Sequence, residues 1–193
     1  MKPGLEKILI LSIDKSIIIR KTSKYMTEKI DIGILIENMA KDISSHCNNK
    51  GCENPLMIGI QRGGVWVATR LHNKLNLKDS LGELNIAFYR DDFSKIGVHP
   101  EVRPSKLSIN LDNRHVILVD DVLHTGRTIR AAMNEIFDYG RPASVVLAIL
   151  IERSGKELPI HADIIGKTIT LKEGEHVKLC GPEPLALEIM KTG

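Results

Sequence analysis

The sequence predicts an α/β fold in which helices cover both faces of a mainly parallel sheet. Short aliphatic segments, typical of strands buried on both faces, alternate along the chain with segments of helical periodicity. A parallel sheet needs this alternation, because helices usually form the crossovers between its strands. With 193 residues, 42% of them hydrophobic and 26% charged, the chain is long enough for one domain with a substantial core.

Three helices are expected, over residues 32–47, 65–75 and 128–139, and the last ends at Gly140 with Pro142 just beyond. The polar stretch 48–55 contains Gly and Pro, and we expect a loop there. Strands are expected over residues 56–60, 84–89, 116–119, 145–151, 164–165 and 177–179.

Charge and cysteine content exclude several classes of protein. The net charge of +3 suits an enzyme of polyanionic substrates but does not demand nucleic acid. Cys47, Cys52 and Cys180 are too few for a disulfide framework, and no further donor pair follows Cys47 and Cys52 to complete a metal site. We expect free thiols in a cytoplasmic protein without a membrane span, since no apolar run has the length of a signal peptide core or a spanning helix.

Residues 1–25 are biased toward Ile, Lys and Ser, and a second start-like sequence follows at Met26. We therefore divide the chain into an N-terminal extension, residues 1–25, and one domain, residues 26–193. The alternative is a genuine N-terminal strand or helix that packs on the domain.

The segment that carries chemistry is a buried strand that runs into two adjacent carboxylates and then a helix. Its residues are Val116, Ile117, Leu118, Val119, Asp120, Asp121, Val122, Leu123, His124, Thr125, Gly126, Arg127 and Thr128. Backbone N–H groups at a helix N-terminus bind phosphate, and Gly126 allows a close approach of the backbone. Asp120 and Asp121 can accept hydrogen bonds from ribose hydroxyls, directly or through Mg²⁺. An ordinary turn capped by Thr125 or Thr128 is the alternative, but the whole string favours phosphate binding.

This segment resembles the motif with which type I phosphoribosyltransferases bind 5-phosphoribosyl-1-pyrophosphate (PRPP). Many members of that class carry Glu-Asp at the acidic pair. Asp-Asp followed by Val-Leu-His-Thr-Gly-Arg-Thr is similar to the PyrR family of pyrimidine operon attenuators, which are also uracil phosphoribosyltransferases. Segments 89–94, 140–144, 157–163 and 181–188 are similar as well, so the resemblance spans about residues 32–191. His124 stands where the family commonly has Tyr.

The resemblance implies a type I phosphoribosyltransferase fold with a small hood, a flexible catalytic lid, and the reaction of uracil with PRPP to give UMP and diphosphate. Asp120 and Asp121 would hold the ribose, and residues 124–128 the 5′-phosphate. Mg²⁺ would bind mainly through PRPP, with the same two carboxylates as candidate ligands. The loop that would bind pyrophosphate, and that often contains a non-proline cis peptide in this class, consists of Gln61, Arg62, Gly63 and Gly64.

The stretch 90–114 is too long for a passive connection and resembles the lid, whose closure would exclude water from an oxocarbenium-like centre. Arg90 joins Asp120 and Asp121 as a candidate catalytic residue. The candidate lid residues are Tyr89, Arg90, Asp91, Asp92 and Arg103. Residues 151–160 and 164–168 would form the uracil pocket of the hood.

The resemblance also implies binding to the mRNA leader of pyrimidine genes and a homodimer or higher homo-oligomer. Candidate RNA contacts are Lys156, His161 and Lys167. His161 stands where arginine is common and Gly155 where histidine can occur, so fewer permanent charges face RNA, and we expect catalysis to be the main function. The alternatives are mainly an RNA-binding attenuator, a phosphoribosyltransferase for another base, or a PRPP-sensing regulator without turnover.

Overall fold

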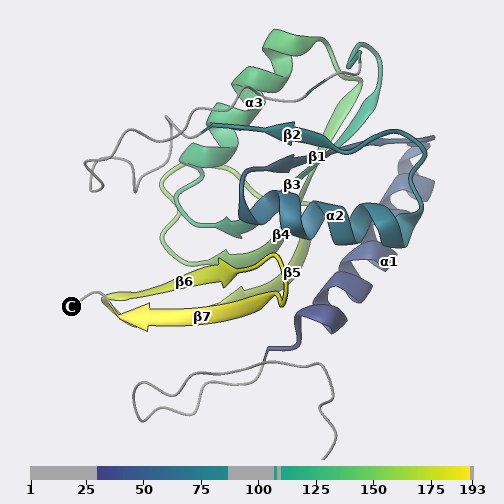
Figure 1. Ribbon diagram of the computed structural model, residues 1–193. Helices are drawn as coiled ribbons and strands as arrows, with labels where there is room; N and C mark the ends of the chain where they lie inside the picture. Colours follow the sequence, from purple (N-terminus) through teal and green to yellow (C-terminus); the bar gives the residue numbers. More distant parts are fainter. Residues whose placement is uncertain (1–29, 87–106, 108–109, 192–193) are drawn as a thin grey trace, which may run out of the picture.

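Five parallel strands form the central sheet of the structure, a computed structural model that describes residues 30–86, 107 and 110–191. In chain order the strands are β1 (Leu56–Ile60), β2 (Gly82–Leu84), β3 (His115–Leu123), β4 (Ser144–Arg153) and β5 (Ile164–Ile169). They lie in the order β2-β1-β3-β4-β5, and every neighbouring pair is parallel (Figure 1). The expected mainly parallel sheet is confirmed.

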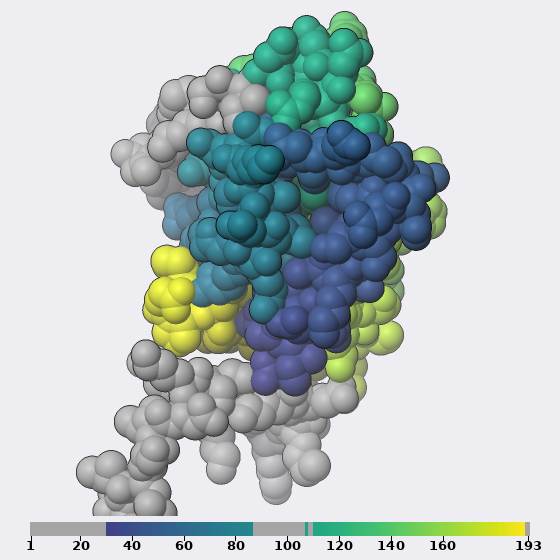
Figure 2. All heavy atoms as spheres, turned by 90° about the vertical axis from the view of Figure 1, so that its right-hand side faces the viewer, coloured from purple at the N-terminus to yellow at the C-terminus, as the bar shows by residue number. Residues whose placement is uncertain are grey.

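Helices cover both faces of this sheet. Helices α1 (Ile32–Lys50) and α2 (Gly63–Leu75) lie on one face, and α3 (Arg127–Tyr139) lies on the other (Figure 1). Alternate residues of β3 serve the two layers: Ile117 and Val119 pack with α1 and α2, whereas Val116 and Leu118 pack with α3. Burial on both sides explains why the strands are continuously aliphatic. Figure 2 shows α1 and α2 side by side on the face turned to the viewer.

The helices begin or end a few residues away from the expected positions. The side chain of Asp31 caps α1 by accepting a hydrogen bond from the Ile34 N–H (3.2 Å). The expected end of this helix at residue 47, and the loop expected from residue 48, are wrong, because α1 continues to Lys50. It ends where Gly51 adopts the left-handed conformation and the Cys52 N–H donates to the Cys47 carbonyl (2.9 Å). Helix α2 begins two residues earlier than expected, at Gly63.

The strand expected over 84–89 is also placed differently. Strand β2 comprises Gly82–Leu84, Asn85 and Ile86 are not in a strand, and residues 87–89 lie outside the described part. Strand β2 pairs only with β1 in the described sheet, and their register ends at the pair Ile60 and Leu84. Pairing therefore stops where β1 turns into α2. Strands β3 and β4 are longer than expected, because they pair with each other as far as Leu123 and Glu152.

A two-stranded antiparallel hairpin, β6 (Glu175–Cys180) and β7 (Ala186–Lys191), forms a separate small sheet. Its β7 strand was not expected from the sequence. Val177 and Leu179 of β6 pack into the core layer of α1 and α2. The turn is held to α2 by Arg70, whose Nη2 donates to the Pro182 carbonyl (2.8 Å) and to Glu183 (2.6 Å). The hairpin is therefore fixed against the same helix that begins at the predicted pyrophosphate loop.

The C-terminal end of the stretch expected to be a lid belongs to the core wall. Leu111 is 1% exposed and packs in the α3 layer, and the Asn113 N–H donates to the Arg141 carbonyl (2.8 Å). Residues 110–114 are thus fixed, which corrects the expected lid boundary at 114. The remainder of the lid lies outside the described residues except for Leu107, which is packed against the α3 layer.

The amino ends of the strands are joined by a polar cluster. Arg114 Nη2 donates to Asp79 (2.6 Å) and to the Asn54 carbonyl (2.9 Å), and Asn54 Nδ2 donates to Asp79 (2.9 Å). The hydrogen bond from Arg114 lowers the pKa of Asp79 below its ordinary value. This cluster fastens the loops that precede β1, β2 and β3. Among the described helices, none is long and apolar enough to cross a membrane.

Candidate active site

The predicted site residues meet where the carboxyl ends of β1 and β3 lie side by side. After β1 the chain turns into α2 on one face, and after β3 it turns into α3 on the opposite face. In an open parallel sheet, a crevice forms between two adjacent strands whose connections leave to opposite faces, and ligands bind there. The strand order therefore places the residues 61–64 and 120–128 at one crevice.

The loop after β1 leads directly into α2. The peptide bond between Gln61 and Arg62 is cis, as the resemblance implies. The Gln61 side chain is directed to β2, where its Nε2 donates to Glu83 (2.9 Å). Arg62 occupies the N-cap position of α2 but makes no side-chain capping hydrogen bond. The backbone amides of the first turn of α2 are therefore left without a side-chain cap at this crevice.

Glycines allow this loop to touch the acidic pair. A Cβ atom on Gly63 would lie 2.2 Å from Oδ2 of Asp121, and one on Gly64 would lie 2.6 Å from the Val119 carbonyl and 3.0 Å from Oδ1 of Asp120. No side chain fits at either position without displacing strand β3 or its carboxylates. The predicted pyrophosphate loop and the predicted ribose-binding pair are thus in direct contact.

The two carboxylates have different surroundings. Asp120 is 5% exposed, and its Oδ1 accepts a hydrogen bond from the Asp121 N–H (2.9 Å). Asp121 is half-buried beside Gly63 and is the more accessible of the two. Within the described residues, no three His, Cys, Asp or Glu side chains converge to hold a metal. This set fits Mg²⁺, which is commonly held by one or two carboxylates together with substrate phosphates rather than by a protein cage.

The loop after β3 has the form expected of a phosphate cradle. Gly126 has φ +92° and is the N-cap of α3, so the predicted alternative of a Thr125 or Thr128 cap is wrong. Thr125 is buried, and its Oγ1 accepts from the Arg127 N–H at 3.3 Å. Of the three helices in the described part of the chain, only α1 is capped by the side chain of its N-cap residue. In both helices that start at the crevice, the N-cap residue makes no such bond.

A segment distant in sequence completes the wall of this cradle. The N–H groups of Glu157 and Leu158 both donate to the Thr125 carbonyl (3.1 Å each). Arg127 forms an ion pair with Glu157 (2.6 Å). A Cβ on Gly155 would lie 2.7 Å from Nε2 of His124. Residues 155–158, which we name the clamp segment, therefore lie along the loop 124–127.

Comparisons with known proteins agree with this geometry. The family model described as "Phosphoribosyl transferase domain" matches residues 26–183. A protein of Nitrosococcus oceani named "Bifunctional protein PyrR" is 56% identical over 162 residues, which cover 83% of this chain and 92% of the relative. A protein of the same name from Pseudomonas aeruginosa is 53% identical over 154 residues, covering 80% of this chain and 91% of the relative.

The chain belongs to the PyrR family of phosphoribosyltransferases. Solved structures of hypoxanthine phosphoribosyltransferases share its fold. The Trypanosoma cruzi protein has a TM-score of 0.57 at 23% identity and covers 72% of this chain and 74% of its own. The Staphylococcus aureus protein has a TM-score of 0.53 at 18% identity, covering 70% of this chain and 74% of its own. These likenesses confirm the type I phosphoribosyltransferase fold.

Several predicted residues of this PyrR family member are buried supports rather than contacts. The buried residues of β3 that precede the acidic pair hold it at the end of the strand; they are Val116, Ile117, Leu118 and Val119. Leu123, the last residue of β3, is also buried. The predicted residues Tyr89, Arg90, Asp91, Asp92 and Arg103 lie outside the described residues, and their roles stay predictions.

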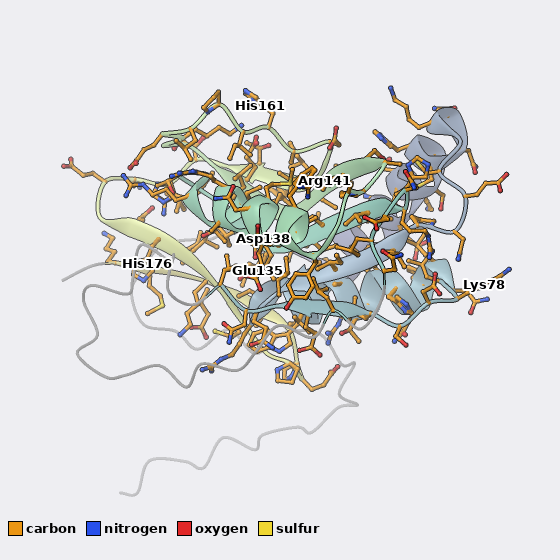
Figure 3. All side chains as sticks on the ribbon, turned by 90° about the horizontal axis from the view of Figure 1, so that it is seen from above. Lys78, Glu135, Asp138, Arg141, His161 and His176 are labelled. Atoms are coloured by element: carbon orange, nitrogen blue, oxygen red, sulfur yellow. The ribbon has the colours of Figure 1, made fainter. Side chains whose placement is uncertain are left out.

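The predicted RNA contacts lie on and around β5. Lys156 forms an ion pair with Glu152 (2.7 Å), and its Nζ lies 3.3 Å from Nδ1 of His161. Lys167 is part of β5. Figure 3 shows His161 at one edge of the molecule and Lys78 at another. The structure therefore brings Lys156 and His161 together, although the charge of Lys156 is already paired.

The cysteines lie on α1, after it, and on β6. All three are free thiols in the structure. Burial, together with the neighbouring Cys52 thiol, raises the pKa of Cys47 to about 11. Such a thiol is almost wholly protonated near neutral pH and is a poor nucleophile.

The contact between Gly63 and Asp121 gives a direct test of the site. A Gly63→Ala substitution places a methyl group where Oδ2 of Asp121 lies, so the carboxylate or the loop must move. We expect the dissociation constant for PRPP, measured by calorimetry with Mg²⁺, to rise by about 10-fold to 100-fold, or roughly 1.4–2.8 kcal/mol.

Gly33→Ala is the matched control, because Gly33 also lies in the first turn of a helix but faces only the side chain of Asp31 (3.1 Å). It should bind PRPP as the unaltered protein does. Unchanged PRPP affinity in a folded Gly63→Ala variant would show that the two segments do not form one site.

Proposed function

We propose that this protein transfers the 5-phosphoribosyl group of PRPP to uracil, producing UMP and diphosphate. One observation carries the proposal: two helix N-termini, neither of them capped by the side chain of its own N-cap residue, flank a pair of aspartates at a single crevice of the sheet. Uncapped backbone amides attract phosphate groups, and the carboxylates between them accept hydrogen bonds from hydroxyls. PRPP has this pattern, with a phosphate at each end of a ribose.

Each part of PRPP has a place in this arrangement. The 5′-phosphate would lie in the cradle 124–128 at the start of α3. The ribose hydroxyls would bind mainly the carboxylate of Asp121 and, to a smaller extent, that of the more deeply buried Asp120. The pyrophosphate would lie against the loop 61–64, with the charge of Arg62 nearby. Asp121 and Asp120 would help PRPP to hold Mg²⁺, which when bound would supply positive charge against the negative charge of the leaving group.

The reaction needs no nucleophile from the protein. The bond from ribose C1 to diphosphate breaks, positive charge develops on the ribose, and N1 of uracil bonds to C1 from the opposite face while its proton is released to water. The carboxylates of Asp120 and Asp121 would stabilise the developing positive charge. Because both ends of PRPP would be held by one rigid sheet, its C1 atom would be oriented for attack by the base, which also accelerates the reaction.

The resemblance to the PyrR family, and relatives above 50% identity, support uracil as the base. The solved hypoxanthine enzymes are below 25% identical to this chain and give no argument for a purine. The base would enter between the clamp segment and β5, the region that the resemblance assigns to base binding.

Steady-state turnover of PRPP in separate assays with uracil, hypoxanthine, guanine and orotate tests this proposal. We expect turnover with uracil alone. Asp121→Asn keeps the shape of the side chain but removes its charge, and it should lower kcat by about 100-fold or more.

The matched control is Asp138→Asn, which makes the same change on the exposed C-terminal part of α3 (Figure 3). Its turnover should equal that of the unaltered protein. Turnover with a purine in place of uracil would contradict the base assignment, and absence of turnover with every base would move the protein to the class of PRPP-sensing regulators.

A second activity, binding to the leader RNA of pyrimidine genes, is favoured by the word "bifunctional" in the names of the relatives and by the cluster of Lys156 and His161. Because Glu152 pairs with Lys156, the cluster offers RNA little net positive charge. We propose a weak RNA site here that UMP strengthens.

Fluorescence anisotropy with the leader RNA, at several KCl concentrations and with or without UMP, tests this site. His161→Arg adds a permanent charge and should tighten binding and steepen the dependence of log K on log[KCl] by about 0.7–0.9. Lys78→Ala, at another edge of the molecule, is the control and should leave binding unchanged. Equal RNA affinity of the His161→Arg variant and the unaltered protein would show that RNA does not bind at this surface.

A further inference from the structure

Arg153 is the last residue of β4, and the Nε–H group of its side chain is buried without a hydrogen-bond acceptor. Its Nε has no hydrogen-bond partner, and it is the single buried side-chain nitrogen or oxygen in that condition among the described residues. The ion pairs of the described residues do not include Arg153. A buried N–H group without a partner destabilises a folded protein, so its retention calls for a reason.

Arg153 lies level with the phosphate cradle. The final register pair of β3 and β4 joins Leu123 to Glu152, so Arg153 is one residue beyond the point where the chain leaves β3 for the cradle. On its other side Arg153 pairs with Ile169 of β5. The residue thus lies at the carboxyl edge of the sheet, between the cradle and the strand expected to contribute to the base pocket.

The contacts of Ile151 and of its register partner Val122 set the face on which Arg153 lies, because the alternation of β4 is interrupted at Leu150 and Ile151, which both pack in the layer of α1 and α2. Ile151, two residues earlier, packs in the core layer that contains Val177 and Leu179 of β6. Arg153 is therefore on the side of the sheet covered by the β6–β7 hairpin. Glu152, on the opposite side, is only 15% exposed in its side chain and already pairs with Lys156 (2.7 Å). The adjacent carboxylate consequently does not neutralise Arg153.

We propose that Arg153 binds a carbonyl oxygen of the base and selects for a dioxopyrimidine. The inference rests on the proposed transfer to uracil and names a residue that recognises the base in it. A guanidinium only donates hydrogen bonds and stays charged, so it suits a carbonyl acceptor and repels the amino group that cytosine carries at position 4. As N1 loses its proton, negative charge moves onto the carbonyl oxygens of uracil, and the half-buried guanidinium, through its buried Nε–H, would stabilise that charge.

Kinetics with sulfur analogues of uracil test this contact. Uracil, 2-thiouracil and 4-thiouracil are compared as substrates of the unaltered protein, Arg153→Met and Arg153→Lys. Sulfur is the weaker acceptor, so the unaltered protein should discriminate against one of the two analogues. We expect Arg153→Met to lower kcat/KM for uracil by about 100-fold and to lose that discrimination. Arg153→Lys keeps a positive charge, so its kcat/KM for uracil should lie between those of the unaltered protein and Arg153→Met.

Two further readouts separate recognition from structural support. PRPP affinity in Arg153→Met should remain within about twofold of the unaltered value, and the melting temperature should be unchanged or higher, because a buried unsatisfied donor has been removed. Arg141→Met is the matched control. Arg141 donates to the backbone carbonyls of Phe137 and Gly140 at the far end of α3, so its loss should lower the melting temperature and leave kinetics unchanged.

The outcomes distinguish this inference from the proposed function. Turnover of uracil by the unaltered protein, with unchanged kcat/KM and discrimination in Arg153→Met, would overturn the role of Arg153 alone. Reduced PRPP affinity in both Arg153 variants, without any change in discrimination, would overturn it too and assign the arginine to a phosphate. Absence of uracil turnover by the unaltered protein would overturn the proposed function and this inference with it.

Discussion

The close approach of the Gly63–Gly64 backbone to the Asp120–Asp121 strand end is the constraint on which the rest of the site depends. It follows from the parallel pairing of β1 with β3, in which Gly59 lies opposite Val119 and both strands then end at the same edge. Since the chain leaves β1 and β3 toward opposite faces, the starts of α2 and α3 flank one acidic pair. A side chain at position 63 or 64 would force these parts apart.

Stabilising hydrogen bonds are missing at the carboxyl edge of the sheet, where the site lies. A side-chain N-cap contributes about 0.5–2 kcal/mol to a helix, yet α2 and α3 lack one while α1, away from the crevice, has Asp31. The buried Nε of Arg153 is a further unsatisfied group at the same edge. The opposite edge shows the reverse, because Arg114, Asp79 and Asn54 satisfy one another there. Such a distribution is typical of proteins whose ligand supplies the missing partners.

Much of this arrangement could be predicted from the sequence, because it rests on local patterns. The aliphatic strand before Asp120, the glycine after Thr125 and the strand before Gln61 are contiguous signals, and their placement at one edge follows from parallel pairing. Strand β7 was missed because Ala186–Lys191 has no clear alternation and lies mostly exposed in a hairpin. The contact of the clamp segment with the cradle was missed because its hydrogen bonds to Thr125 join residues about thirty positions apart, although residues 151–160 were expected to contribute to the base pocket. A single arginine at the end of an aliphatic strand gives no sequence pattern that predicts its contacts. The unpaired, buried Nε of Arg153 could therefore be recognised only from the structure.

A crystal structure of the protein with PRPP and Mg²⁺ bound would test the proposed PRPP site most directly. We expect the 5′-phosphate on the backbone amides of residues 124–128, the ribose hydroxyls on Asp120 and Asp121, and the pyrophosphate against residues 61–64. PRPP in the reverse orientation, or bound away from the crevice between β1 and β3, would contradict the central claim that the two uncapped helices and the acidic pair form one PRPP site.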